Sequence, residues 1–87
     1  MALATVTVFT DVDLQRLGAH IRAARRAHGL TQEQVAWRAD ITVNHYGLIE
    51  GGKAKGLRVQ SLYALCQVLS LSADYLLGLT DSPSSPH

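Results

Sequence analysis

Two short helical segments separated by only a few residues place the strongest constraint on what this chain can fold into. Thr31, followed three residues later by Gln34, has the pattern of a capping box and opens the first segment. Asp40 then stands where the chain must turn sharply, and Asp is among the few residues other than Gly that tolerate a positive φ. Thr42 is the next N-cap candidate, and the segment after it, Val43 to Glu50, ends at two glycines. The pattern predicts a helix, a tight turn and a second short helix.

The two segments predict a close helical hairpin. Ala36 is a small residue at the point where the helices must approach each other, and a larger side chain would push them apart. In such a hairpin the helix of Val43 to Glu50 protrudes, and the major groove of DNA is wide enough to admit it. The preceding helix of the hairpin then lies across the DNA backbone. This geometry favours a DNA-binding function.

Helical spacing of apolar residues predicts further helices on both sides of the hairpin. Thr10 with Asp13 forms another capping-box pattern before a helix of about Asp11 to Ala27, and Gly29 supplies a stop. After the basic loop KAKGL, which we expect to be mobile, a longer helix is predicted. Its buried face would carry Val59, Leu62, Leu65, Cys66 and Leu69.

The C-terminal region predicts one more short helix. Ser72 caps the segment ADYLL, and Gly78 closes it. We therefore expect an all-α domain of five helices over residues 11–79. Before it lies an arm, residues 1–10, that alternates like a short strand, and after it a tail rich in Ser and Pro, residues 80–87, that we expect to be disordered.

Length and composition limit the class of protein. A chain of 87 residues has room for one compact domain. It contains no apolar run long enough to cross a bilayer and its N-terminus lacks the features of a secretory signal, so we expect a cytoplasmic protein without a membrane partner. Cys66 stands alone among apolar neighbours, so we expect it to be buried, and we expect no disulfide, metal or cofactor.

Charge and chemistry favour a binding protein over an enzyme. From Arg22 to Arg58 there are seven cations and three anions, which modestly favours a nucleic-acid partner. No nucleophile stands beside a base, His20 and His28 lie eight residues apart, and no glycine-rich phosphate loop is present. We expect no catalytic activity.

The chain resembles the helix-turn-helix family of lambda repressor and Cro, also called the XRE family, from about Leu17 to Leu77. The resemblance is carried by IRAARRAHGLTQEQVAWRA, by DIT at the turn, by YGLIEGGKAK and by LYALCQVLSLSADYLL. The most specific parts are Gly29 to Gln32 and Ile49 to Lys53. The resemblance implies a five-helix fold like that of lambda repressor and a transcriptional regulator that binds double-stranded DNA, with repression as the expected sign.

The resemblance also implies contacts to DNA phosphates. Thr31 and Gln32, at the start of the second helix, would donate hydrogen bonds to phosphate, although Thr31 can equally serve as a simple cap. The cations Lys53, Lys55 and Arg58 match the loop that follows the DNA backbone in similar proteins, while each alone could be solvated surface.

Base readout is expected from the early, exposed residues of the third helix. These are Val43, Asn44 and His45, with Leu48 one turn later. The amide of Asn44 can pair with adenine N6 and N7 together, whereas Val43 and Leu48 can touch only a thymine methyl group. The helix departs from related ones, which are often rich in Gln, Arg, Ser and Thr. Gly47 costs roughly 1 kcal/mol relative to Ala, which a close approach to DNA would offset.

Other positions have structural or partner-binding interpretations. By resemblance, Arg25 and Glu50 form an ion pair between the first and third helices. Trp37 stands where relatives carry a polar residue, so it is either a lid over the core or part of a partner surface.

We expect a twofold dimer on a palindromic operator, since two helices about 34 Å apart double the sequence that is read. One candidate surface, favoured by the resemblance, is Tyr75, Leu76, Leu77 and Leu79. The other is the strand-like segment Thr5 to Phe9, whose backbone could pair with a second subunit. The rival function is a protein-interaction module, such as the DNA-binding antitoxin of a toxin pair, whose main partner is a protein.

Overall fold

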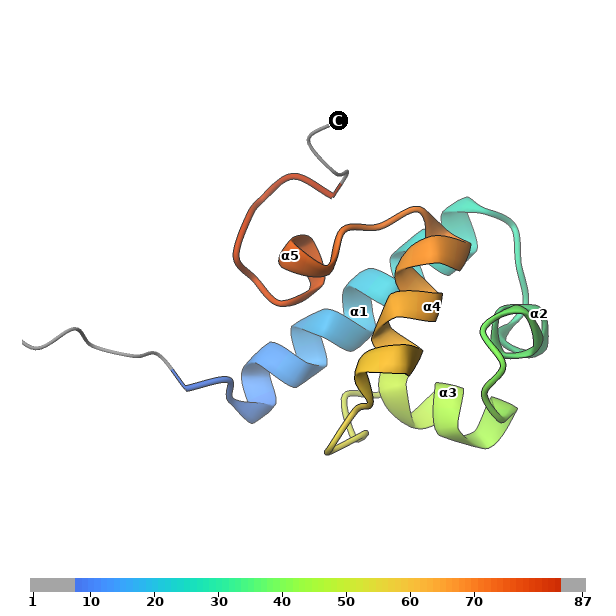
Figure 1. Cartoon of the computed structure of the whole chain (residues 1–87), viewed down its shortest axis with the longest axis horizontal. Helices are drawn as coiled ribbons and strands as arrows, with labels where there is room; N and C mark the ends of the chain where they lie inside the picture. The colour runs from blue at the N-terminus through green and yellow to red at the C-terminus, as the bar shows by residue number, and fades with distance from the viewer. Residues whose placement is uncertain (1–7, 84–87) are drawn as a thin grey trace, which may run out of the picture.

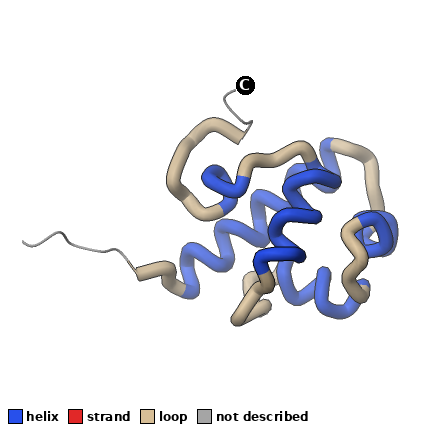
Figure 2. The backbone as a smooth tube through the Cα atoms, viewed as in Figure 1, coloured by secondary structure: helices blue, strands red, loops and turns tan. Residues whose placement is uncertain are grey.

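The computed structural model describes residues 8–83 of the 87-residue chain, and the regular structure in this part is entirely α-helical (Figures 1 and 2). The prediction of an all-α, five-helix domain is confirmed. The expected N-terminal strand falls mostly outside the described residues, and residues 8–10 are not in a strand. The helices are α1 (Asp11–Ala27), α2 (Gln32–Arg38), α3 (Val43–Glu50), α4 (Val59–Leu69) and α5 (Ala73–Leu76).

Polar caps fix where four of the five helices begin. In each of them a Ser or Thr hydroxyl accepts a hydrogen bond from the backbone N–H three residues later, which satisfies one of the N–H groups that a helix start leaves free. At α1 and α2 the capping box is reciprocal. The capping residues are Thr10, Thr31, Thr42 and Ser72. The remaining helix, α4, begins after Arg58, whose side chain does not cap it.

The turn between α2 and α3 has the backbone geometry that the sequence predicts. Asp40 has a φ of 58°, and the N–H of Ile41 donates to the carbonyl of Ala36 across the turn at 3.0 Å. Ala36 is 2% exposed, so its small side chain lies where the two helices meet. The helix-turn-helix hairpin is therefore present as expected.

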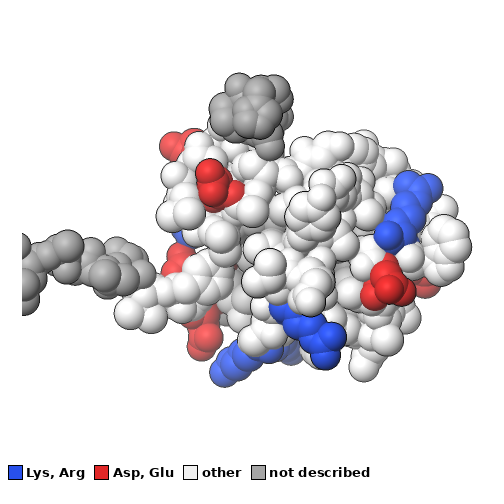
Figure 3. Space-filling model, viewed as in Figure 1, with Lys and Arg blue, Asp and Glu red and all other residues white. Residues whose placement is uncertain are grey.

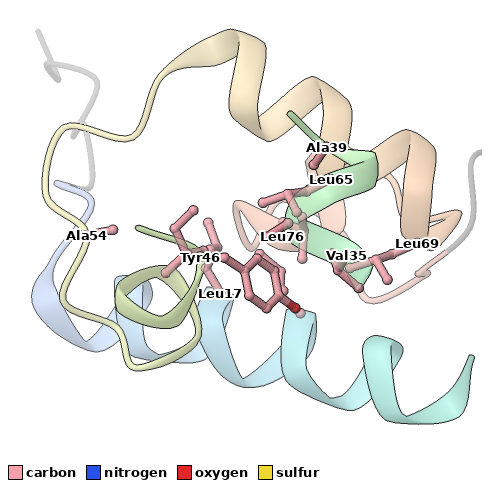
Figure 4. Close-up of a cluster of buried hydrophobic side chains, with 11 residues drawn as sticks. Leu17, Val35, Ala39, Tyr46, Ala54, Leu65, Leu69 and Leu76 are labelled. Carbon is pink, nitrogen blue, oxygen red and sulfur yellow. The ribbon is translucent and has the colours of Figure 1, made fainter. Parts of the chain in front are cut away.

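A single apolar core joins all five helices (Figure 4). Helix α1 packs against α3, α4 and α5, and α2 packs against α3 and α4. The close crossing of α1 and α3 depends on Gly18, because a Cβ there would collide with the carbonyl oxygens of Ile49 and Glu50. The core is made of Leu17, Ile21, Val35, Ala36, Ala39, Tyr46, Ile49, Ala54, Leu65, Leu69 and Leu76.

Packing corrects the predicted buried face of α4. Val59, expected to be buried, is 78% exposed, whereas Ser61, which the apolar pattern passed over, is 7% exposed. Cys66 is half-buried, and burial raises the pKa of its thiol. The buried face is therefore rotated toward Ser61, since α4 must meet α2 as well as α1.

The C-terminal region returns toward the core. Leu76 is 1% exposed, and the backbone N–H of Ser72 donates to the carbonyl of Pro83 at 2.9 Å. Disorder of residues 80–87 stays a prediction, since residues 84–87 lie outside the described part. No helix within residues 8–83 is long and apolar enough to cross a membrane.

Candidate nucleic-acid interface

Helix α3 presents one face to the core and the opposite face to solvent. Tyr46 and Ile49 are fully buried, while Val43 and Leu48 are 45% and 42% exposed. Asn44 is also exposed. The expected base-contacting residues Val43, Asn44 and Leu48 are thus all accessible on the outer side of α3. The inner side of the helix anchors it in the core.

His45 is placed differently from the other three candidates. It is half-buried, its backbone N–H donates to the Thr42 hydroxyl at 3.1 Å, and its side chain lines a recess between α3 and the start of α4. His45 and Arg58 therefore line the same recess, and the His45 side chain is less accessible than those of the other three candidates.

The end of α3 is held by a buried ion-pair network. The Glu50 side chain is fully buried, and its carboxylate accepts hydrogen bonds from Arg25 Nε at 2.6 Å and from Arg22 Nε at 3.3 Å. Arg25 also donates to the carbonyl of Leu30 at 3.0 Å, which ties the same guanidinium to the start of α2. The expected Arg25–Glu50 pair is present, and it joins α1 to α3.

Electrostatics keep this network charged. Burial by itself raises the pKa of Glu50, but the hydrogen bonds from Arg25 and Gln32, the positive charge of Arg25 and the nearby Tyr46 phenol outweigh it and lower the pKa to about 2. Burial also raises the pKa of the Tyr46 phenol well above its usual range, with the Glu50 carboxylate adding to the effect. The Tyr46 hydroxyl is fully buried and makes no hydrogen bond of good geometry. The carboxylate of Glu50 is therefore ionised at neutral pH, and Tyr46 is a neutral phenol.

The two expected phosphate-contacting residues of α2 are partly engaged within the protein. The backbone N–H of Thr31, which we expected to serve phosphate, donates to the side chain of Gln34 at 2.8 Å, so the capping role holds and that N–H is taken. The amide of Gln32 donates to Glu50 at 3.0 Å. An amide nitrogen carries two N–H groups, so Gln32 keeps one donor for phosphate. The network thus holds Gln32 in place at the start of α2.

The basic loop after α3 lies at one edge of the molecule. Lys53, Lys55 and Arg58 are exposed, and Figure 3 shows basic side chains gathered around the connection between α3 and α4. Ala54 is only 4% exposed and the N–H of Lys53 donates to the carbonyl of Leu48 at 2.9 Å. We expected a mobile loop, but its middle is anchored in the core.

Sequence reasoning missed two residues that shape this surface. Arg22 pairs with Glu50 and its side chain is 45% exposed. Its position three residues before Arg25 in the same helix is the sequence feature that indicates this role. Gly18 allows α1 and α3 to approach, and no local pattern indicated it.

Two other expectations concern partner surfaces. Trp37 is 83% exposed, so it is not a lid over the core. Leu76 is buried in the core, whereas Tyr75 is half-buried and its ring stacks on His20 with centroids 4.3 Å apart. Of the four residues expected there, Leu79 is exposed, at 72%.

Comparisons with known proteins agree with this geometry. A family model described as a helix-turn-helix domain matches residues 16–77. The chain is also similar to an uncharacterized HTH-type transcriptional regulator, YobD, of Bacillus subtilis (strain 168), with 40% identity over 63 residues. That match covers 72% of this chain and 55% of the relative, so the chain spans about half the length of the relative that it matches.

Proposed function

Because the chain belongs to the XRE family of helix-turn-helix proteins, we propose that it binds double-stranded DNA sequence-specifically and regulates transcription, with α3 in the major groove. The observation that carries the proposal is the fixed presentation of α3. Its outer face exposes Val43, Asn44 and Leu48, while Tyr46 and Glu50 hold its inner face and its end. Asn44 would read adenine through two hydrogen bonds, and the two apolar side chains would contact thymine methyl groups.

Contacts to phosphate would set the register of the helix on the duplex. Gln32 at the start of α2 and the cations Lys53, Lys55 and Arg58 after α3 flank the reading helix. These contacts supply affinity that depends on salt, whereas the base contacts supply sequence preference. Arg22 adds a half-exposed cation beside Gln32, because both side chains meet at Glu50.

We propose repression as the sign of regulation and a twofold dimer as the acting form. Occupation of an operator is enough to exclude other proteins from it. A single helix reads only a few base pairs, so a second copy on a palindromic site raises selectivity. Among the expected dimer residues, Leu79 and Phe9 are 72% and 45% exposed. Sedimentation of the full chain and of a version starting at Thr10, each with a palindromic duplex, tests the dimer and the contribution of the N-terminal segment.

The alternative is an interaction module whose main partner is a protein. One observation favours it, since Trp37 is 83% exposed on α2 and has no use in the DNA contacts proposed above. Selection of bound duplexes from a random library discriminates between the two functions. Enrichment of one sequence supports the DNA-binding regulator, and its absence, together with weak duplex binding at low salt, supports the protein-binding alternative.

A further inference from the structure

Helix α2 carries an exposed surface that neither the core nor the proposed DNA contacts use. Trp37 is 83% exposed there, and Glu33 and Arg38 are exposed on either side of it. We call these three residues the α2 face; the opposite side of the helix packs against α3 and α4. An exposed indole leaves a large apolar surface in water, and Trp is among the residues that most often anchor contacts between proteins.

The two charges of the α2 face are unpaired within the described part of the chain. Glu33 lies in the first turn of α2 and Arg38 is its last residue, so a carboxylate and a guanidinium stand at opposite ends of the face. The ion pairs among residues 8–83 join other side chains. Both charges are therefore available to an external partner.

The spacing of these residues makes the α2 face complementary to itself. Glu33 and Arg38 are five residues apart, which is about 7.5 Å along a helix. When two such helices lie antiparallel about a twofold axis, Glu33 of one copy stands level with Arg38 of the other, and symmetry repeats the pair. The two Trp37 rings are then offset by about 4.5 Å along the axis, which suits an offset stack. The face can thus meet a copy of itself without a clash of like charges.

The α2 face is separate from the surfaces considered above for dimerisation. Figure 1 shows α2 at the end of the molecule away from α5 and from the N-terminal segment. The exposed side chains of Leu79 and Phe9 belong to that other end. Both surfaces can therefore be occupied at once, so contacts through α2 would link neighbouring pairs of molecules.

We propose that the α2 face binds the same face of a second copy of this chain. Glu33 of each copy pairs with Arg38 of the other, and the two Trp37 rings pack between the ion pairs. A Trp contributes at most about 250 Å², so two indoles with their neighbours bury less than the roughly 1,200 Å² of a standard interface. The contact is therefore weak in free solution.

The α2 contact gains strength when two copies are held on one duplex. Their effective concentration is then on the order of millimolar, which is enough for a weak contact to form. Copies at adjacent sites would bind cooperatively through α2. This step rests on the proposed function, whereas the contact between free copies does not.

Trp37 is the only tryptophan of the sequence, so tryptophan fluorescence reports on the α2 face directly. The first experiment follows the emission maximum and the acrylamide quenching of the full chain as its concentration is raised, with sedimentation equilibrium in parallel. We expect a shift to shorter wavelength and weaker quenching, because self-association buries the indole. An indole that stays fully quenchable at every concentration overturns the proposal and leaves the α2 face to a different protein.

Charge reversal tests whether the partner is a second copy. Glu33→Arg and Arg38→Glu each replace two attractive pairs with two repulsive ones, so each variant alone should self-associate at least about tenfold more weakly. An equimolar mixture of the two variants should associate again, because each reversed residue then meets an opposite charge. Restoration by mixing also shows that both variants are folded.

The control for charge reversal is Arg26→Glu, an exposed change of the same size on α1, which should self-associate like wild type. Two results overturn the α2 contact. One is a mixture of Glu33→Arg and Arg38→Glu that associates no better than either variant alone. The other is an equal loss of association in Arg26→Glu and Arg38→Glu.

A duplex experiment separates the α2 contact from DNA binding. Trp37→Ala keeps every charge of the chain, so its affinity for a duplex with one selected site should equal that of wild type. On duplexes with two such sites at several spacings, the second wild-type copy should bind at least about tenfold more tightly than the first, and Trp37→Ala should lose this gain. Equal gains in both proteins overturn the contact on DNA. Absence of binding to the single site contradicts the proposed function, while fluorescence and mixing still decide the α2 face.

Discussion

The Nε atom of Arg25 lies 2.6 Å from the Glu50 carboxylate, and this contact joins the last turn of α1 to the last residue of α3 across 25 positions of sequence. Because the Glu50 side chain is fully buried and also accepts a hydrogen bond from Gln32, one carboxylate holds the end of α3 and the start of α2 together.

Removal of Arg25 should destabilise the fold strongly. Arg25→Ala leaves a buried carboxylate with only Arg22 and Gln32 as donors, so the free energy of unfolding should fall by about 3 to 5 kcal/mol. Urea denaturation measures this loss in the free energy of unfolding. Arg26→Ala, an exposed change in the same helix, should stay within about 0.5 kcal/mol of wild type. Similar losses in both variants would show that the pair contributes little.

Stability should fall in acid because of Glu50. Its pKa is lowered from 4.5 to about 2, so the stabilisation is complete above about pH 4.5 and is lost as the pH falls toward 2. The difference corresponds to about 3 kcal/mol. Thermal melting from pH 6 down to 2 should show a shallower decline for Glu50→Gln than for wild type. Parallel declines would assign the acid sensitivity to other carboxyl groups, such as Asp13, whose pKa is lowered by hydrogen bonds from Thr10.

Gly47 should lower the stability of the free protein and favour DNA binding. A Cβ at this position meets no protein atom within 4 Å, so Gly47→Ala should stabilise the free protein by about 1 kcal/mol. If the backbone approaches DNA closely here, the same change weakens binding to every duplex. Gly18→Ala is the contrasting variant, since its Cβ collides with backbone of α3 and should destabilise the fold. Unchanged duplex affinity of Gly47→Ala would rule out the close approach.

Asn44 should determine sequence preference. Asn44→Ala should lose about 1 to 3 kcal/mol of binding free energy on the selected site, while affinity for an unrelated duplex stays nearly constant. Fluorescence anisotropy on both duplexes measures the difference. An equal loss on the two duplexes contradicts a role in base readout.

The loop lysines should determine the salt dependence. Neutralising Lys53 and Lys55 by substitution with Gln should weaken binding to all sequences and reduce the slope of log affinity against log salt by about 0.9 for each phosphate contact removed. Ala54 between them is buried, so the loop should keep its conformation in this variant. A slope equal to that of wild type would mean that these side chains do not reach phosphate.

The sequence by itself determined the helices and the hairpin. Their starts depend on hydrogen bonds between residues three apart, as at Thr10, Thr31 and Thr42, and such short-range patterns can be read directly along a chain. The positive φ of Asp40 was likewise predictable, because few residues tolerate that turn. The family resemblance added the Arg25–Glu50 pair, which no local pattern indicates.

Only the tertiary structure decided which surfaces are free. Val59 and Trp37 are exposed and Ser61 and Leu76 are buried because of how distant elements pack, and apolar periodicity within one helix cannot show where a second helix will cover it. Arg22 meets Glu50 across 28 residues, and Gly18 matters only because α3 crosses there. Local hydrogen bonds join residues a few positions apart in the sequence, whereas burial depends on contacts between segments that are distant in the sequence.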